Sequence, residues 1–352
     1  MKRIVLIMVV SLFACLIALA LCETYLRMKH VQPYERTFPS RHYDKLAEEV
    51  VWWAQSDPEL GWTGNKKMPG INPQGFREER DFDRIDKQAD KTRIMILGDS
   101  FIYGTSAWPS ITTLLEMKLQ NQYEAFNLAV PGWGIDQMYL AYLKYRDKLR
   151  PDLVILAFID EDVARVLEAF RRYEGLSKPS FEVQNGDLIV RTSANPLEVS
   201  VNRLLGKSVF ISHIMHEFYL LAVARPLVET ILSKMVGDMQ RRNERIIALR
   251  IPTPRNLYGG KEQNFLVRVV RNVMWRLRSF KAISQTLHLQ YLEPLEAMTS
   301  SPDWVQNLYL NDGHFSEAGS KQMAEYLYKE ILEHQGDVRL RENEREEQPM
   351  KR

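Results

Sequence analysis

The sequence predicts an α/β fold, a doubly wound parallel sheet of the flavodoxin-like kind in a three-layer α/β/α arrangement. Three observations lead to this prediction. From about residue 93 onward, short apolar runs alternate with amphipathic patterns of helical length. An Asn-Gly pair at residues 185–186 lies between two alternating runs and indicates an inserted hairpin. A long apolar run near the N-terminus indicates a transmembrane helix.

The strands of the predicted sheet are short apolar runs with helical patterns between them. Runs of this length, separated by helices, are typical of parallel β-α-β units with helices on both faces. The expected strands are residues 94–97, 125–130, 153–158, 246–249 and 289–292. The expected helices are residues 111–119, residues 138–149 and a last helix that Ser316 caps.

An insertion is expected over about residues 171–240. Residues 181–184 and 187–190 alternate in polarity around Asn185-Gly186, the strongest short-range signal for a hairpin. The segment that follows has amphipathic helical patterns. We therefore expect a hairpin and helices between two strands of the main sheet.

Four parts of the chain are distinguished by their composition. Residues 1–30 form a transmembrane anchor, and residues 31–92, rich in Pro, Trp and charge, form a linker and collar. Residues 93–335 form the main domain. Residues 336–352 are a charged tail that we expect to be disordered, because it has few apolar residues to bury.

The anchor prediction depends on residues 4–22, whose only polar side chain is Ser11. As a helix this run is about 28 Å long, close to the thickness of the hydrocarbon core of a bilayer. A cleaved secretory signal is the alternative, but Leu21-Cys22-Glu23 is a poor cleavage site. We expect the chain to contact the membrane through residues 4–22.

The charges that flank the apolar run favour one orientation weakly. Lys2 and Arg3 precede the run, and Arg27 and Lys29 follow it. The amino terminus adds a positive charge before the run, and Glu23 subtracts one after it. This difference places the N-terminal end of the chain on the cytoplasmic side. The expectation is a single-pass protein of the inner (cytoplasmic) membrane with its domain on the periplasmic side; a cytoplasmic domain is the alternative.

Composition excludes several classes of partner and cofactor. The net charge is only +2 with both signs interspersed, so no nucleic-acid partner is expected. Cys15 and Cys22 are the two cysteines and lie in the apolar run, which leaves no thiol for a metal site in the domain. His213, His216 and Glu217 have helical metal-ligand spacing but lack a further ligand, so we interpret them as structural. No metal or cofactor is predicted.

Ser100 is the candidate nucleophile. It lies just past the end of the first predicted strand, on the edge of the sheet where open α/β folds bind ligands. Gly98 permits a sharp turn, and the following helix directs its N–H groups toward the serine. The alternative for Asp99 and Ser100 is an ordinary turn or helix cap. A serine hydroxyl needs a base to become a nucleophile.

His314 is the candidate base. It lies between the last predicted strand and the last helix, which places it on the same edge of the sheet as Ser100. Asp312, two residues earlier, can orient the imidazole and stabilise its protonated form. The alternative is a surface histidine that caps the last helix. Together the three residues form a candidate Ser-His-Asp set.

These motifs resemble the SGNH (GDSL-type) hydrolase superfamily, in particular its membrane-anchored bacterial members. Residues 96–101 (Ile-Leu-Gly-Asp-Ser-Phe) resemble the first block, residues 127–134 the second, and residues 312–315 (Asp-Gly-His-Phe) the last. The resemblance covers about residues 92–335, apart from the insertion. It implies a catalytic triad of Ser100, His314 and Asp312, and an oxyanion hole formed by the N–H groups of Ser100 and Gly132.

The implied activity is that of a serine esterase or O-acyltransferase that forms an acyl-serine. The anchor indicates that its substrate is an acylated small molecule, glycan or lipid of the cell envelope. A catalytically weak or inactive protein that binds glycan or an envelope assembly partner is the alternative.

Two departures from the family pattern affect the site. The third block supplies an Asn to the oxyanion hole, whereas here residues 153–158 lead into Ile159-Asp160-Glu161-Asp162. An ionised Glu161 would repel the oxyanion, but a protonated one can donate a hydrogen bond to it. In addition, Asn311 stands where many members have the triad acid, so Asp312 takes that role in our prediction.

Overall fold

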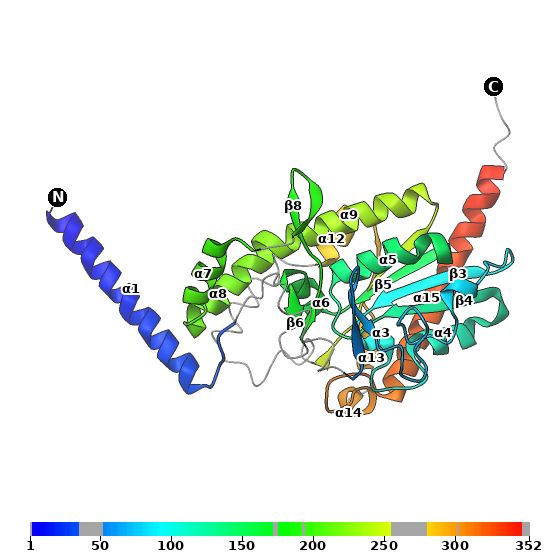
Figure 1. The fold of residues 1–352 in the computed structure, drawn as a ribbon, viewed down its shortest axis with the longest axis horizontal. Coiled ribbons are helices and arrows are strands. Elements are labelled where there is room, and N and C mark those ends of the chain that lie inside the picture. The colour runs from blue at the N-terminus through cyan, green and yellow to red at the C-terminus, as the bar shows by residue number, and fades with distance from the viewer. Residues whose placement is uncertain are drawn as a thin grey trace, which may run out of the picture.

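The fold was analysed in a computed structural model of the chain (Figure 1). It describes residues 2–34, 52–171, 175–191, 194–254, 280–300 and 303–346. A basic stretch of the sequence that contains Arg268, Arg271, Arg276 and Arg278 lies outside the described residues.

The core of the molecule is a five-stranded sheet in which every pair of neighbouring strands is parallel. Its strands are β3 (Thr92–Gly98), β4 (Tyr123–Ala129), β5 (Leu153–Phe158), β10 (Arg245–Arg250) and β11 (Gln290–Leu292). They lie in the order β11-β10-β5-β3-β4, which is the 2-1-3-4-5 order of flavodoxin-like folds. The predicted fold class is therefore confirmed, and each predicted strand is present.

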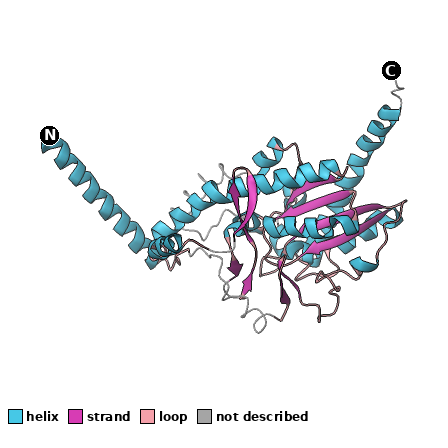
Figure 2. Ribbon diagram, turned by 45° about the horizontal axis from the view of Figure 1, so that its top comes forward, coloured by secondary structure: helices cyan, strands magenta, loops and turns pink. Residues whose placement is uncertain are grey.

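Helices cover both faces of the sheet, as Figure 2 shows. On one face lie α5 (Ile135–Leu149), α9 (Arg225–Arg241) and α12 (Phe280–Thr286); on the other lie α4 (Ile111–Leu119) and α15 (Glu317–Glu346). Successive side chains of a strand point to opposite faces. Met95 and Leu97 of β3 accordingly pack toward α5 and α9, while Ile94 and Ile96 pack toward α4 and α15.

The collar packs on the sheet as a small hairpin and a short helical turn. These are β1 (Ala54–Asp57), β2 (Gly61–Gly64) and η1 (Phe82–Arg84). Trp62 is buried against the main domain, and its carbonyl accepts a 3.0 Å hydrogen bond from Trp133 Nε1. Trp52, at the start of the described collar, is exposed.

The insertion contains the predicted hairpin and two helices that project from the domain. Its elements are β6 (Phe170–Arg171), β7 (Leu176–Ser177), β8 (Ser180–Gln184), β9 (Asp187–Arg191), α7 (Pro196–Leu205), α8 (Val209–Tyr219) and the π-helical turn η4 (Leu220–Ala224). Asn185 and Gly186 both have positive φ, at 52° and 83°, as a type I′ turn requires. The predicted boundary at residue 240 is too late, because α9 packs on the sheet as the crossover helix before β10.

Helix α1 and the C-terminal part of α15 extend away from the sheet (Figure 1). By length and composition, α1 (Lys2–Met28) can cross a membrane, a property that it shares with signal sequences. At the other end, α15 continues to Glu346, beyond the predicted start of a disordered tail. The tail is rich in Glu and Arg and has no proline before residue 349, so it favours a helix despite its charge.

Candidate active site

Ser100 is the first residue of the short helix α3 (Ser100–Tyr103), immediately after β3. A Cβ at Gly98 would lie 2.7 Å from the side chain of Ile102, so the turn between strand and helix requires glycine. The Asp99 carboxylate caps the helix by accepting a hydrogen bond from Phe101 N at 3.0 Å. The backbone N–H of Ser100 has no acceptor within the helix, as is general for a first turn.

His314 comes from the loop between α14 (Trp304–Leu308) and α15. Its Nε2 lies 2.8 Å from Ser100 Oγ, although the two residues are 214 positions apart in the chain. The ring of Phe101 packs against the imidazole, with 5.2 Å between the ring centroids. The structure therefore brings together the two residues that were predicted as nucleophile and base.

Asp312 lies beside the other nitrogen of the imidazole. Its Oδ2 is 3.2 Å from His314 Nδ1, although Nδ1 makes no well-formed hydrogen bond. The carboxylate also accepts hydrogen bonds from His314 N at 3.0 Å and from Ser106 Oγ at 3.1 Å. Desolvation raises the pKa of Asp312, but the hydrogen bonds from His314 and Ser106 outweigh it, and the pKa lies below its ordinary value.

Gly132 lies in a tight turn after β4. Its φ is +79°, and Trp133 N donates to Val130 O at 3.3 Å, so Pro131-Gly132 occupies the centre of the turn. The collar fixes this turn from outside, because Trp62 Nε1 donates to Pro131 O at 3.1 Å. Val130 N also donates to Gly98 O at 3.3 Å, which ties the turn to the loop of Ser100.

Arginine side chains bind two of the three acidic residues that follow β5. This acidic run forms the short helix α6 (Asp160–Ala164), followed by the turn η3 (Arg165–Leu167). Arg250 at the end of β10 binds Asp160 in bidentate fashion, at 2.8 and 2.7 Å. Glu161 is the acid that remains, and its Oε2 is buried without a hydrogen-bond partner among the described residues. No contact places this carboxyl on Ser100 or on Gly132, so its predicted role in the oxyanion hole stays a prediction.

Arg165 connects the three loops that meet at the carboxyl ends of the strands. Its Nη1 contacts Asp162, lies 3.5 Å from Asp99 Oδ2 and donates to Trp133 O at 3.1 Å. Asp99 precedes Ser100, and Trp133 follows Gly132. One guanidinium therefore holds the serine loop, the glycine loop and the acidic loop in fixed positions.

The carboxyls around Arg165 are strongly desolvated. Asp162 is fully buried, and burial together with the nearby carboxylate of Asp99 raises its pKa well above the ordinary value. Asp162 Oδ2 also accepts a 2.9 Å hydrogen bond from Ile159 N at the end of β5. A second buried pair lies alongside, in which Lys178 Nζ is 2.5 Å from Asp136 Oδ2 and 2.7 Å from Arg165 O.

Sequence reasoning missed three residues that organise this region. Arg165 and Lys178 carried no signal beyond the Asp162–Arg165 spacing of three, which is typical of a helical ion pair. Asn127 in β4 is the third. Its side chain donates to Ile102 O in α3 at 3.1 Å and accepts from Ala129 N at 3.1 Å, so it joins α3 to the end of β4. A buried polar residue within an apolar strand was the available signal.

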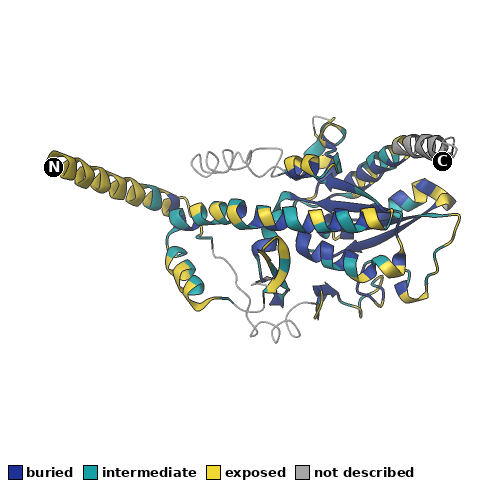
Figure 3. Cartoon of the chain, turned by 90° about the horizontal axis from the view of Figure 1, so that it is seen from above, coloured by how far each residue is buried: buried dark blue, intermediate teal, exposed yellow. Residues whose placement is uncertain are grey.

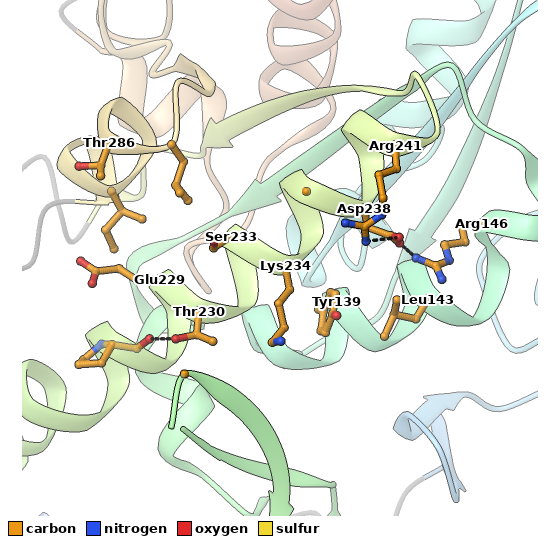
Figure 4. Close-up of a pocket in the computed structure, with 15 residues that line it drawn as sticks. Tyr139, Leu143, Arg146, Glu229, Thr230, Ser233, Lys234, Asp238, Arg241 and Thr286 are labelled. Carbon is orange, nitrogen blue, oxygen red and sulfur yellow. Dashed lines mark hydrogen bonds and ion pairs between the residues drawn. The ribbon is translucent and has the colours of Figure 1, made fainter. Parts of the chain in front are cut away.

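A separate hollow of about 850 Å³ lies on the helical face formed by α5, α9 and α12 (Figure 4). Its charged residues form ion pairs: Asp238 binds Arg146 and Arg241 within the hollow, whereas Glu229 and Lys234 pair with Arg225 and Asp187 outside its lining. Thr230 donates to the backbone of its own helix. Neither Ser100 nor His314 lines it. The candidate catalytic residues therefore lie outside this hollow.

Comparisons with known proteins find similarities among solved structures. No protein-family model matches the chain, and no curated protein matches it. Among solved structures it is similar to a GDSL-like lipase from Bacteroides thetaiotaomicron, with a TM-score of 0.42 and 10% identity over 72% of this chain and 94% of that one. A lipase/acylhydrolase from Enterococcus faecalis has a TM-score of 0.38 and 15% identity, covering 68% and 95% of the two chains. A variant acetyl xylan esterase from Geobacillus stearothermophilus has a TM-score of 0.39 and 14% identity, covering 68% and 94%.

Similarities at these TM-scores and identities carry no weight on activity, so the class rests on the chain itself. The sheet order is flavodoxin-like, Ser100 follows the first strand of the sheet, and His314 reaches it from the loop before the last helix. The sequence blocks around these residues resemble those of SGNH-type hydrolases, and the structure brings the first and last of these blocks together at one edge of the sheet.

Proposed function

We propose that the chain is a serine esterase or O-acyltransferase that acts through an acyl-serine at Ser100. The observation that carries the proposal is the 2.8 Å distance between Ser100 Oγ and His314 Nε2. This is hydrogen-bond reach for a general base and its nucleophile. In the proposed triad, Asp312 stabilises the positive charge that develops on His314.

The proposed reaction has two transfers. His314 takes the proton from Ser100 Oγ as the oxygen attacks the acyl carbon, and the resulting oxyanion is held by the N–H groups of Ser100 and Gly132. The intermediate collapses, the ester C–O bond breaks, and His314 returns the proton to the leaving alcohol. Water or an acceptor hydroxyl then gives its proton to His314 and attacks the acyl-serine. As the bond between the acyl carbon and Ser100 Oγ breaks, His314 returns the proton to Ser100 Oγ.

The proposed site has no Asn in the third block. The contacts of Arg165 support our proposal that the oxyanion hole functions without it. The contacts of this arginine with Asp162, with Asp99 and with the carbonyl of Trp133 hold both N–H donors of the proposed oxyanion hole in place. An oxyanion hole with one donor fewer typically loses about 10²–10³ in rate. We therefore expect a slow enzyme.

The proposed substrate is an acyl or acetyl ester of an envelope glycan or lipid, and the proposed location is the inner membrane with the domain on the periplasmic side. The support is α1, which is long enough to span. A non-catalytic protein that binds glycan or an assembly partner is the second candidate. The acidic run in place of the Asn favours it. Glycan binding that is unchanged in both Ser100→Ala and His314→Ala would support this second candidate.

The test is hydrolysis of small acetyl esters by the purified full chain. We expect measurable turnover with an initial burst, and a loss of at least about 10³-fold in Ser100→Ala and in His314→Ala. Ser200→Ala, at an exposed serine of α7, is the matched control and should behave like the wild type. Equal rates in the wild type and Ser100→Ala would overturn the proposal.

A further inference from the structure

Helix α7 presents an apolar stripe that nothing covers among the described residues. Leu197 and Leu204 are 71% and 66% exposed, and Val201 between them is 45% exposed. Positions separated by four and three residues lie on one face of a helix. No residue of α7 is buried, so the helix gains little from packing on the domain.

The neighbouring helix α8 adds two exposed apolar side chains. Ile214 and Phe218 are 43% and 54% exposed and lie four residues apart, on one face. The opposite side of α8 is anchored, with Val209 and Ser212 buried. Scattered exposed apolar residues are common, but stripes on two consecutive helices mark an interaction surface.

The end of α1 is bound to the start of α8. Glu23 accepts hydrogen bonds from Val209 N at 3.0 Å and Phe210 N at 2.9 Å, and so caps α8. Ser208 Oγ adds a bond of 2.8 Å, and Arg27 Nη2 donates to Lys207 O at 2.7 Å. Figure 3 shows the exposed helix α1 meeting the inserted helices at this point.

The described residues that follow α1 also lie along α8. His213 Nε2 is 3.1 Å from Gln32 O, and Tyr34 N donates to Ser212 Oγ at 2.9 Å. The Tyr34 ring stacks on His216 at 3.5 Å. These histidines thus hold the segment after α1 against the insertion, and the position of α7 and α8 follows that of α1.

We propose that α7 and α8 lie in the headgroup region of the same bilayer that α1 crosses, with their apolar stripes toward the acyl chains. The inference rests on the anchor proposed above. Glu23 directly follows the apolar run, so α8 begins at the level where the chain leaves the hydrocarbon core. Amphipathic helices at such an interface bury their apolar face by about 5–10 Å.

The charges near this surface suit a lipid partner. Arg203 and Lys207 are exposed beside the α7 stripe, and Arg27 lies at the end of α1. Basic groups at a membrane surface are attracted to anionic headgroups. Because the start of α8 is bound to the end of the anchor, a bilayer covers this surface without any further component, and the domain is then held to the membrane at two points.

The test measures the depth of single probes in the reconstituted full chain. Cys15 and Cys22 are replaced by alanine, and the environment-sensitive dye NBD is attached at Leu204→Cys. Vesicles contain phosphatidylcholine, phosphatidylglycerol and nitroxide-labelled lipids. Met117→Cys, on the exposed face of α4, is the matched control. We expect strong quenching and a blue-shifted emission at position 204, and neither at position 117.

A probe on native Cys15, with Cys22 replaced, separates failure of the anchor from failure of the surface contact. Quenching at Cys15 with none at position 204 overturns the proposal. So does shielding of position 204 from aqueous iodide without quenching by lipid, because that result indicates a protein partner. No quenching at Cys15 also overturns it, since α1 is then not in the bilayer. The double variant Leu197→Glu/Val201→Glu should lower the quenching at position 204 severalfold.

Discussion

The two halves of the candidate site are built differently. Ser100 is supported by buried groups, since Asp99 and Asp162 are fully buried and are linked by Arg165. His314 comes from a surface loop, and the side chain of its partner Asp312 is 54% exposed. Buried charges are costly to leave unpaired, whereas exposed ones are solvated by water. Changes on the serine side should therefore affect the fold as well as the rate, and changes on the histidine side the rate alone.

The largest effect on stability is expected for Arg165→Ala. Removing the guanidinium leaves Asp99 and Asp162 facing each other without a cation, which typically costs about 3–5 kcal/mol. Urea unfolding of the detergent-solubilised chain, followed by tryptophan fluorescence, measures this cost. Arg241→Ala, at an exposed arginine that also pairs with an aspartate, is the control and should change little. An unchanged urea midpoint for Arg165→Ala would contradict the proposal that Arg165 stabilises the fold by pairing with the buried Asp99 and Asp162.

Asp312→Asn tests the exposed side of the comparison. The change removes the charge beside His314 Nδ1 and should lower kcat/KM by about 10²-fold, less than the roughly 10⁴-fold known for a buried triad acid. The unfolding midpoint should stay the same. Ser106→Ala, which removes only a hydrogen bond to Asp312, is the control for the loop. A full 10⁴-fold loss would show that exposure does not weaken this acid.

Asp162→Asn tests the charge state of the buried side through pH. Burial and Asp99 raise the pKa of Asp162 in the folded chain. For a raised pKa, the stabilising contribution is present below the unfolded pKa of about 3.9 and is lost as the pH rises through the folded value. The wild type should therefore lose more stability than Asp162→Asn between about pH 4 and neutral pH. Urea midpoints across this range measure the difference, and Asp90→Asn, at an exposed loop position, should retain the wild-type slope.

The smallest effect is expected for Trp62→Phe in the collar. The ring stays buried, but Pro131 O loses its hydrogen bond, which is worth about 0.5–1.5 kcal/mol. If that bond positions Gly132, kcat should fall severalfold while KM changes little. Trp52→Phe, at the exposed tryptophan, is the matched control. A change in KM alone would mean that Trp62 acts on the substrate and not on the turn.

The sequence predicted the parts of the structure that depend on local patterns. The apolar run 153–158 became β5 with the same bounds, and Asn185-Gly186 formed the predicted turn. Ser100 and His314 were found because each lies in a recognisable block at the end of an element. The approach of the two side chains followed from the rule that the carboxyl ends of parallel strands share one edge.

Local sequence patterns did not predict the contacts between distant segments. Arg165 is one of many arginines, and only the fold places it between Asp99 and Trp133 O. The predicted insertion includes α9 because an amphipathic pattern does not say what its apolar face packs on; in the structure that face packs on the sheet. The acidic run was interpreted as a missing donor, while the structure shows Asp160 and Asp162 engaged by Arg250 and Arg165.

The most direct test of the central claim is labelling of the full chain with a fluorophosphonate serine probe, located by mass spectrometry. We predict that the label is attached to Ser100, that His314→Ala slows its attachment strongly, and that Ser100→Ala abolishes it. A wild-type protein that carries no label on Ser100, or one labelled there at the same rate with and without His314, would contradict the proposed nucleophile and base.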